Sequence, residues 1–209
     1  MHYGFPAVVP VRQRKEHQRP SRPPHPAPPP PKSRGVPGEA NQSIEGRQPK
    51  PESDLGSLDV LGDVPPPATS VDMCFYDGFK LNSGAVVSGG DGVILYGGEA
   101  FRWRPWVARD GAALRLLNSK GQWDTANEAF QMFEGLWPRP DMLIIGTGRQ
   151  IRPVAPDLRK YISSLGIRVD VVDTRNAASQ YNMMATERGE LEVAAALIPM
   201  GWQEGVGAK

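Results

Sequence analysis

Two strand–helix–strand units follow one another between Met142 and Ile198, and this arrangement limits the chain to very few folds. Met142–Ile145 is a continuous apolar run, the pattern of a strand that is covered on both faces. The predicted elements are a strand at Met142–Ile145, a helix from Pro156 to Gly166, a strand at Ile167–Val172, a helix from Thr174 to Gly189 and a strand at Val193–Ile198. Strands joined by crossover helices of this length should lie parallel, with right-handed connections.

The preceding segment predicts shorter elements. They are a strand around Met73–Phe79 with a turn at Asp77-Gly78, a hairpin of Val93–Tyr96 and Ala100–Trp106 closed through Gly97-Gly98, a short strand at Leu114–Leu117, and a helix capped by Asp124 that ends before Pro138. Together these elements predict an α/β domain of three layers with a central mixed β-sheet over residues 70–203, followed by a flexible end at 204–209.

Prolines are concentrated at the start of the chain, where 16 of the 22 lie in residues 1–67. This segment can bury too little apolar surface to offset its chain entropy, so we expect a disordered proline-rich N-terminal tail. Its first 38 residues carry seven Lys or Arg and one acid, which is compatible with a mitochondrial targeting extension. The alternatives are an SH3-type ligand at the polyproline run Arg22–Lys32 and a solvated tail without a partner.

Composition excludes several classes of function. Residues 68–209 carry 15 basic and 16 acidic side chains, a balance unsuited to binding nucleic acid. Cys74 is the only cysteine and all three histidines lie in residues 1–67, so we expect no disulfide, no metal site and no cofactor. We interpret Cys74 as a small buried side chain rather than a nucleophile. No apolar run approaches the roughly 20 residues of a transmembrane segment.

Two turns follow predicted parallel strands, at the sheet edge where α/β folds bind their ligands. The candidate ligand-binding residues are Gly146, Thr147, Gly148, Arg149, Asp173 and Thr174. Arg149 and Arg152, close to a helix N-terminus, could hold an anion. The third glycine of a dinucleotide fingerprint is missing, because that position is Ile151. The alternative is a strand-to-helix turn that needs glycine dihedral angles.

Asp173 and the residues that follow it also have interpretations that are structural and not functional. Asp173 is a candidate general base, but the folded part offers no histidine partner. The alternative is that Asp173 accepts hydrogen bonds from neighbouring backbone N–H groups while Thr174 caps the helix. We expect Tyr181 to be a core residue with a satisfied hydroxyl and Asn182 to bond to a neighbouring loop.

The five tryptophans are more than a domain of this size is expected to bury. Trp103 and Trp106 are three positions apart on a predicted strand, so their side chains should point to opposite faces. Both are candidate anchors for a protein partner, because aromatic side chains dominate interface hot spots.

The sequence blocks LIIGTG (Leu143–Gly148), PDLRKYISSLGI, VVDTRNAASQYNMMATE (Val171–Glu187) and VAAALIP (Val193–Pro199) resemble the mitochondrial complex I (NADH:ubiquinone oxidoreductase) assembly factor 3 family. The opening FYDGF at Phe75–Phe79 and the glycine-rich stretch into Trp103 fit the same pattern. The resemblance covers about residues 72–203 and says nothing of residues 1–67 beyond allowing a targeting extension.

That resemblance implies a non-enzymatic assembly factor at the matrix side of the mitochondrial inner membrane. Its partners would be other complex I assembly factors and early complex I subunits, and its membrane association would be peripheral and through them. The alternative hypothesis is a small α/β domain that binds an anionic small molecule or nucleotide at the two turns.

Overall fold

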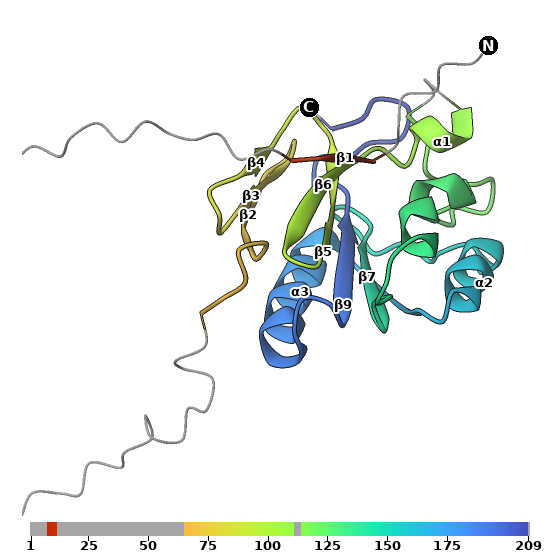
Figure 1. Cartoon of the computed structure of the whole chain (residues 1–209). Coiled ribbons are helices and arrows are strands. Elements are labelled where there is room, and N and C mark those ends of the chain that lie inside the picture. The colour runs from red at the N-terminus through yellow and green to blue at the C-terminus, as the bar shows by residue number, and fades with distance from the viewer. Residues whose placement is uncertain (1–7, 12–64, 111–113, 209) are drawn as a thin grey trace, which may run out of the picture. The chain divides into compact units, whose positions relative to one another are not determined.

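The computed structural model describes residues 8–11, 65–110 and 114–208 (Figure 1). Most of the proline-rich segment, and with it the predictions of disorder, targeting and SH3 binding, lies outside these ranges. The described elements are β1 (Val8–Pro10), β2 (Val71–Cys74), β3 (Phe79–Leu81), β4 (Val86–Val87), β5 (Gly92–Tyr96), β6 (Glu99–Trp103), α1 (Val107–Asp110), the 3₁₀ helix η2 (Asn127–Glu134), β7 (Met142–Gly146), α2 (Pro156–Ser164), β8 (Arg168–Val172), α3 (Thr174–Arg188) and β9 (Val193–Leu197).

Six strands form the central sheet in the order β1-β6-β5-β9-β7-β8. Strand β7 pairs in parallel with β8 on one side and β9 on the other, whereas β5 and β9 are antiparallel. The sheet is therefore mixed, as predicted, and the hairpin of β5 and β6 turns at Gly97-Gly98 as expected. Strand β9 lies inside the sheet, between β5 and β7.

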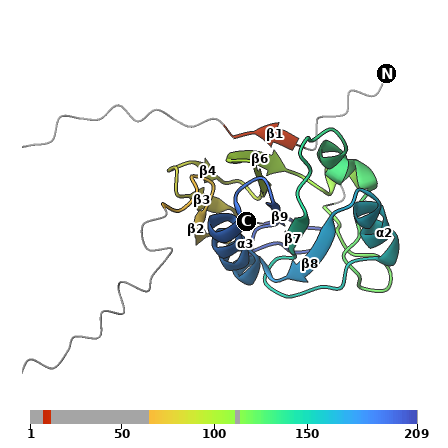
Figure 2. The same ribbon diagram turned by 60° about the horizontal axis from the view of Figure 1, so that its bottom comes forward.

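Two hydrophobic clusters cover the two faces of this sheet, giving three layers (Figure 2). Helices α2 and η2 pack on one face. Helix α3 packs on the other face, together with the separate three-stranded sheet of β2, β3 and β4. Small side chains make this second packing close, since Ala177 and Ala178 of α3 and Ala195 of β9 are all buried in the same cluster. The predicted fold class is confirmed.

Asn182 and Tyr181 of α3 connect the helix to the small sheet. The Asn182 amide accepts a hydrogen bond from the Val71 N–H (2.8 Å) and donates one to the Val71 carbonyl (3.0 Å), so it bonds β2 as a neighbouring strand would. The Tyr181 hydroxyl is bonded to Thr69 Oγ1 at 2.9 Å in the buried core. The prediction of a satisfied core hydroxyl for Tyr181 is confirmed, whereas Asn182 bonds a strand and not the loop that was expected.

Aromatic side chains dominate the face under α2 and η2. The rings of Trp103 and Phe130 are 5.3 Å apart and those of Trp103 and Trp123 are 5.9 Å apart. Trp103 is fully buried and Trp106 is 7% exposed, both in this one cluster. The prediction that the pair points to opposite faces is wrong, because β6 ends at Trp103 and Trp106 lies in the turn beyond the strand.

Other boundaries also differ from the prediction. Leu114–Leu117 forms no strand, and Leu117 makes an isolated bridge to Trp123. The expected helix after Asp124 is the 3₁₀ helix η2, whose N-cap is Ala126. Its buried residues Phe130 and Phe133 are three apart, which matches the three residues per turn of a 3₁₀ helix. Trp137 therefore falls beyond the helix and is 95% exposed.

The end of the described chain is held by hydrogen bonds where a flexible segment was expected. Gln203 and Gly207 form an antiparallel bridge, and the Glu204 carboxylate accepts the Leu116 N–H at 2.9 Å. Among the described residues, no helix has the length and apolar character to cross a membrane. The same part of the chain contains no group of three or more His, Cys, Asp or Glu that could hold a metal ion.

Candidate functional site

Strands β7, β8 and β9 end at one edge of the sheet. Gly146, the last residue of β7, pairs with Val172 of β8 and with Leu197 of β9. The segments that follow these three residues therefore emerge side by side at the carboxyl edge, where ligands bind in α/β sheets. The structure thus brings the two predicted turns together at one place.

Thr174 connects the three strand ends. Its fully buried hydroxyl donates a hydrogen bond to the Ile198 carbonyl (2.6 Å) and accepts one from the Gly148 N–H (2.9 Å). The Thr174 N–H donates to the Gly148 carbonyl at 2.8 Å. Thr174 was predicted to cap α3, and this prediction is wrong: it is the first helical residue, with its side chain bonded to the strand ends.

Hydrogen bonds of Thr147 hold the turn after β7 in place. Thr147 Oγ1 donates to the Gln150 carbonyl (2.9 Å) and accepts the Arg152 N–H (3.0 Å), while the Thr147 N–H donates to the Val172 carbonyl (3.0 Å). Gly148 adopts φ 90°, a backbone conformation that favours glycine. The N–H groups of Thr147 and Arg152 are therefore already engaged within the fold.

Asp173 occupies the N-terminus of α3. Its Oδ1 accepts the N–H groups of Arg175 and Asn176, both at 3.1 Å, and this makes it the N-cap. The interpretation of Asp173 as an acceptor of neighbouring backbone bonds is confirmed. The Asp173 carboxylate therefore occupies the N–H donors at the N-terminus of α3, which an external anion would otherwise use.

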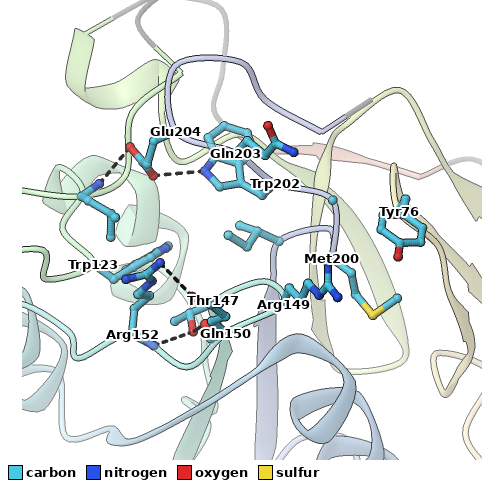
Figure 3. A pocket seen from close by; sticks show the side chains of 13 residues that line it. Tyr76, Trp123, Thr147, Arg149, Gln150, Arg152, Met200, Trp202, Gln203 and Glu204 are labelled. Atoms are coloured by element: carbon cyan, nitrogen blue, oxygen red, sulfur yellow. Dashed lines mark hydrogen bonds between the residues drawn. The ribbon is translucent and has the colours of Figure 1, made fainter.

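A cleft of about 430 Å³ lies between the turn after β7 and the segment after β9 (Figure 3). Its walls carry aromatic, cationic and amide side chains, among them Tyr76, Trp123, Arg149, Gln150, Arg152 and Trp202. A second cavity of about 270 Å³ shares Tyr76, Arg149 and Met200 with it and reaches Asp173 and Arg175. The two predicted turns therefore line neighbouring cavities that share three residues.

Trp202 is held in place on the wall of the cleft. Its ring stacks on that of Trp106 at 4.2 Å between centroids, and its Nε1–H donates to Glu204 Oε1 at 3.2 Å. Glu204 itself accepts the backbone N–H groups of Leu116 and Leu117. The buried Trp106 thus supports a residue of the cleft, whereas surface docking by Trp103 and Trp106 is not supported by their burial.

Arginines provide the charge of the cleft. Arg149 of the cleft and Arg175 of the second cavity are exposed, and within the described ranges neither makes a salt bridge. Arg152 Nη2 donates to the neutral Gln150 Oε1 at 3.0 Å. By contrast, Arg102 and Arg104 are both paired with Asp91. The cleft therefore presents guanidinium groups with donors still available.

Burial argues against nucleophilic chemistry at Cys74. Desolvation raises the pKa of the Cys74 thiol, and the nearby Arg175 lowers it by less. A raised pKa leaves little thiolate at neutral pH. This agrees with the interpretation that Cys74 is not a nucleophile, although its side chain is half-buried and not fully buried as expected.

Residues 71–198 match the model of a protein family described as "Protein of unknown function (DUF498/DUF598)". The chain belongs to the DUF498/DUF598 family. The matched range contains both strand-end turns, Tyr76 and Trp123, and it ends just before the wall formed by residues 200–204.

Curated proteins similar to this DUF498/DUF598 chain bear the name NADH dehydrogenase (ubiquinone) 1 alpha subcomplex assembly factor 3. The protein from Xenopus tropicalis is 38% identical over 72 residues, covering 34% of this chain and 38% of that protein. The one from Bos taurus is 32% identical over 97 residues, covering 44% of this chain and 52% of that protein. The chain thus spans about half or less of the length of these relatives. The resemblance inferred from the sequence blocks is confirmed.

Solved structures of bacterial proteins are also similar. A Bordetella parapertussis protein gives a TM-score of 0.44 at 22% identity, covering 62% of this chain and 94% of that chain. A Bartonella henselae protein described as an outer membrane protein gives 0.44 at 19% identity, covering 64% and 97%. A Bordetella pertussis protein described as an Mth938-like domain gives 0.42 at 21% identity, covering 67% and 90%.

Sequence reasoning found the two turns of this DUF498/DUF598 chain but missed Tyr76, Trp202 and Glu204. One signal was available for Trp202 and Glu204, since both follow the last predicted parallel strand and must emerge at the same edge. Tyr76 had no such signal, because the turn between β2 and β3 reaches the cleft through a tertiary contact. That contact is the hydrogen bond from the Gly201 N–H to the Tyr76 carbonyl at 2.8 Å.

Proposed function

We propose that this chain is a non-enzymatic assembly factor for respiratory complex I in mitochondria. It acts by binding other assembly factors and early complex I subunits at the matrix side of the inner membrane, with which it associates peripherally through those partners. The observation that carries the proposal is the similarity to proteins named assembly factor 3 of the NADH dehydrogenase alpha subcomplex, within a family to which the chain belongs.

An apolar surface beside β2 is the docking face that we assign to this function. Met73 is 51% exposed and Phe75 is 37% exposed. Both line a groove between β2 and α3. The other lining residues are the apolar Val71, Cys74 and Ala178 and the polar Asp72, Arg175 and Ser179. Large apolar side chains that line a common exposed groove are typical of protein-binding surfaces. Strand β2 is also an edge of its three-stranded sheet.

Deletion and complementation test the assembly role. Cells that lack the chain should contain less assembled complex I on native gels, and the tagged full-length protein should restore it and comigrate with assembly intermediates. Normal complex I after deletion, with the tagged chain recovered as a free monomer, would contradict the proposal.

Paired variants test the docking face. Met73→Lys places a charge in the groove beside β2 and should abolish comigration with the intermediates. Val86→Lys is the matched control, because Val86 is 48% exposed on β4, the opposite edge of the same small sheet. If the two variants comigrate equally well, the partner binds elsewhere on the domain.

A further inference from the structure

We propose that the cleft between the turn after β7 and the segment after β9 binds a small organic anion. The ligand carries a carboxylate or phosphate group attached to an aromatic or apolar body. The cleft shares no lining residue with the groove beside β2, and the proposal does not depend on the assembly role. Its support comes from the shape, the charge and the aromatic walls of the cleft.

The shape and place of the cleft are those of a ligand site. Its volume of about 430 Å³ falls within the range of small-molecule pockets, roughly 300–1,000 Å³. The chain leaves β7 for β8 on one side and returns to β9 on the other, so the crevice beside β7 is a point where the strand order reverses. Open α/β sheets bind ligands at such points.

The charge arrangement favours an anionic group. Arg149 and Arg152 line the cleft, and a guanidinium fork matches the geometry of carboxylate and phosphate oxygens. Glu204 is the one acid on the lining of the larger cavity, and both of its oxygens accept protein N–H groups. The lining therefore has a positive balance, with donors left for a ligand.

The aromatic residues suit the uncharged part of the ligand. Trp202 is fixed by its stack on Trp106, and Figure 3 shows Tyr76 across the cleft from Trp123. Trp123 is 1% exposed, and its Nε1 is a buried N–H without an acceptor among the described residues. Because this N–H has almost no accessible surface, Trp123 contributes to the lining of the cleft through its ring.

The binding mode differs from that of a phosphate loop. The N–H groups of Thr147, Gly148 and Arg152 already have acceptors, and Asp173 caps α3. Recognition therefore depends on arginine side chains and fits one anionic group rather than the polyphosphate of a nucleoside triphosphate.

Nuclear magnetic resonance of the full chain can test this proposal through the indole N–H signals of its five tryptophans. The probes are phenylacetate, phenyl phosphate, inorganic phosphate and benzyl alcohol. We expect phenylacetate, phenyl phosphate or both to shift the Trp123 and Trp202 signals saturably, and whichever binds identifies the preferred group. Benzyl alcohol and inorganic phosphate should bind at least about tenfold more weakly, because each lacks one half of the ligand.

Variants link the binding to the arginines. Replacing both residues (Arg149→Gln with Arg152→Gln) should weaken probe binding at least about tenfold, the loss expected when charge-assisted bonds are removed. Arg188→Gln, at the C-terminal end of α3 outside the cleft, should leave binding unchanged. The proposal is overturned if neither aromatic anion shifts these signals saturably up to about 10 mM, if the double variant binds as well as the original chain, or if benzyl alcohol or inorganic phosphate binds as tightly as the aromatic anions.

Discussion

The turns after β7 and β8 lie at the same level of the sheet edge, yet they are built in opposite ways. After β8 the helix begins at once, with Asp173 as its cap and Thr174 turned inward to the strand ends. After β7 the chain runs from Thr147 to Ala155 before α2 begins at Pro156, and this longer segment places Arg149 and Arg152 on the cleft.

The difference shows that a position at the carboxyl edge is not enough to make a binding site. At the β8 turn, Asp173 and Thr174 engage the local donors and acceptors, so this turn holds the fold together. At the β7 turn, the N–H groups of Thr147, Gly148 and Arg152 have acceptors, while the side chain of Arg149 is exposed and forms no salt bridge within the described ranges. The two turns should therefore respond differently to substitution, in stability at one and in binding at the other.

The largest expected effect is at Thr174. Thr174→Val keeps the side-chain shape but removes the bond to the Ile198 carbonyl and leaves the Gly148 N–H without its acceptor. Leaving two buried polar groups unsatisfied should lower the free energy of unfolding by about 2–4 kcal/mol. Urea denaturation followed by circular dichroism measures this loss.

Thr186→Val is the matched control on the same helix. The Thr186 hydroxyl donates to the Asn182 carbonyl within α3 and holds no other element. Its replacement should change the free energy of unfolding by less than about 1 kcal/mol. Equal losses from the two valine variants would show that the Thr174 hydroxyl does not join the strand ends as described.

A second test adds one methyl group where the two turns meet. A Cβ on Gly146 would lie 2.8 Å from Leu197 Cδ2 and 2.9 Å from the backbone Cα of Thr174. Gly146→Ala should therefore force the turns apart and cost about 1–3 kcal/mol in thermal or urea unfolding. Gly135→Ala is the control, since its added Cβ would be 3.9 Å from the nearest atom and its φ is −91°. Similar stabilities would mean that the turns can separate freely.

The sequence predicts the parts of this arrangement that depend on local pattern. The apolar run of β7, the helix start at Pro156 and the parallel pairing of β7 with β8 all follow from spacing and composition within a few tens of residues. The role of Asp173 as an acceptor was predictable for the same reason, because its bonds reach only two and three residues along the chain.

The parts that sequence reasoning missed depend on contacts between distant segments. The hydroxyl of Thr174 finds the Ile198 carbonyl 24 residues away, and no local pattern separates this role from helix capping. Trp106 and Trp202 are 96 residues apart in the sequence, yet their stack builds the wall of the cleft. The cleft forms where the ends of three strands and the β2–β3 turn come together, and these segments are far apart in the sequence.

A smaller effect is expected at the cap of α3. Asp173→Ala removes the acceptor for the N–H groups of Arg175 and Asn176 and should cost about 1 kcal/mol in urea unfolding. Asp173→Asn keeps an oxygen at the same position and should recover most of that loss. If the asparagine variant is as unstable as the alanine variant, the negative charge, rather than the hydrogen-bonding oxygen, stabilises the turn after β8.

The smallest stability effect should come from Arg149, and this defines the contrast between the two turns. Arg149 is exposed and makes no salt bridge within the described ranges, so Arg149→Gln should change the free energy of unfolding by less than about 0.5 kcal/mol. The same variant should weaken phenylacetate or phenyl phosphate binding at the cleft, measured by indole N–H shifts. A loss of stability comparable to that of Thr174→Val would place Arg149 among the residues that hold the strand ends. If Arg149→Gln leaves the stability unchanged and weakens binding, the turn after β7 binds a ligand whereas the turn after β8 stabilises the fold. The two turns would then differ in role although both follow parallel strands at the same edge.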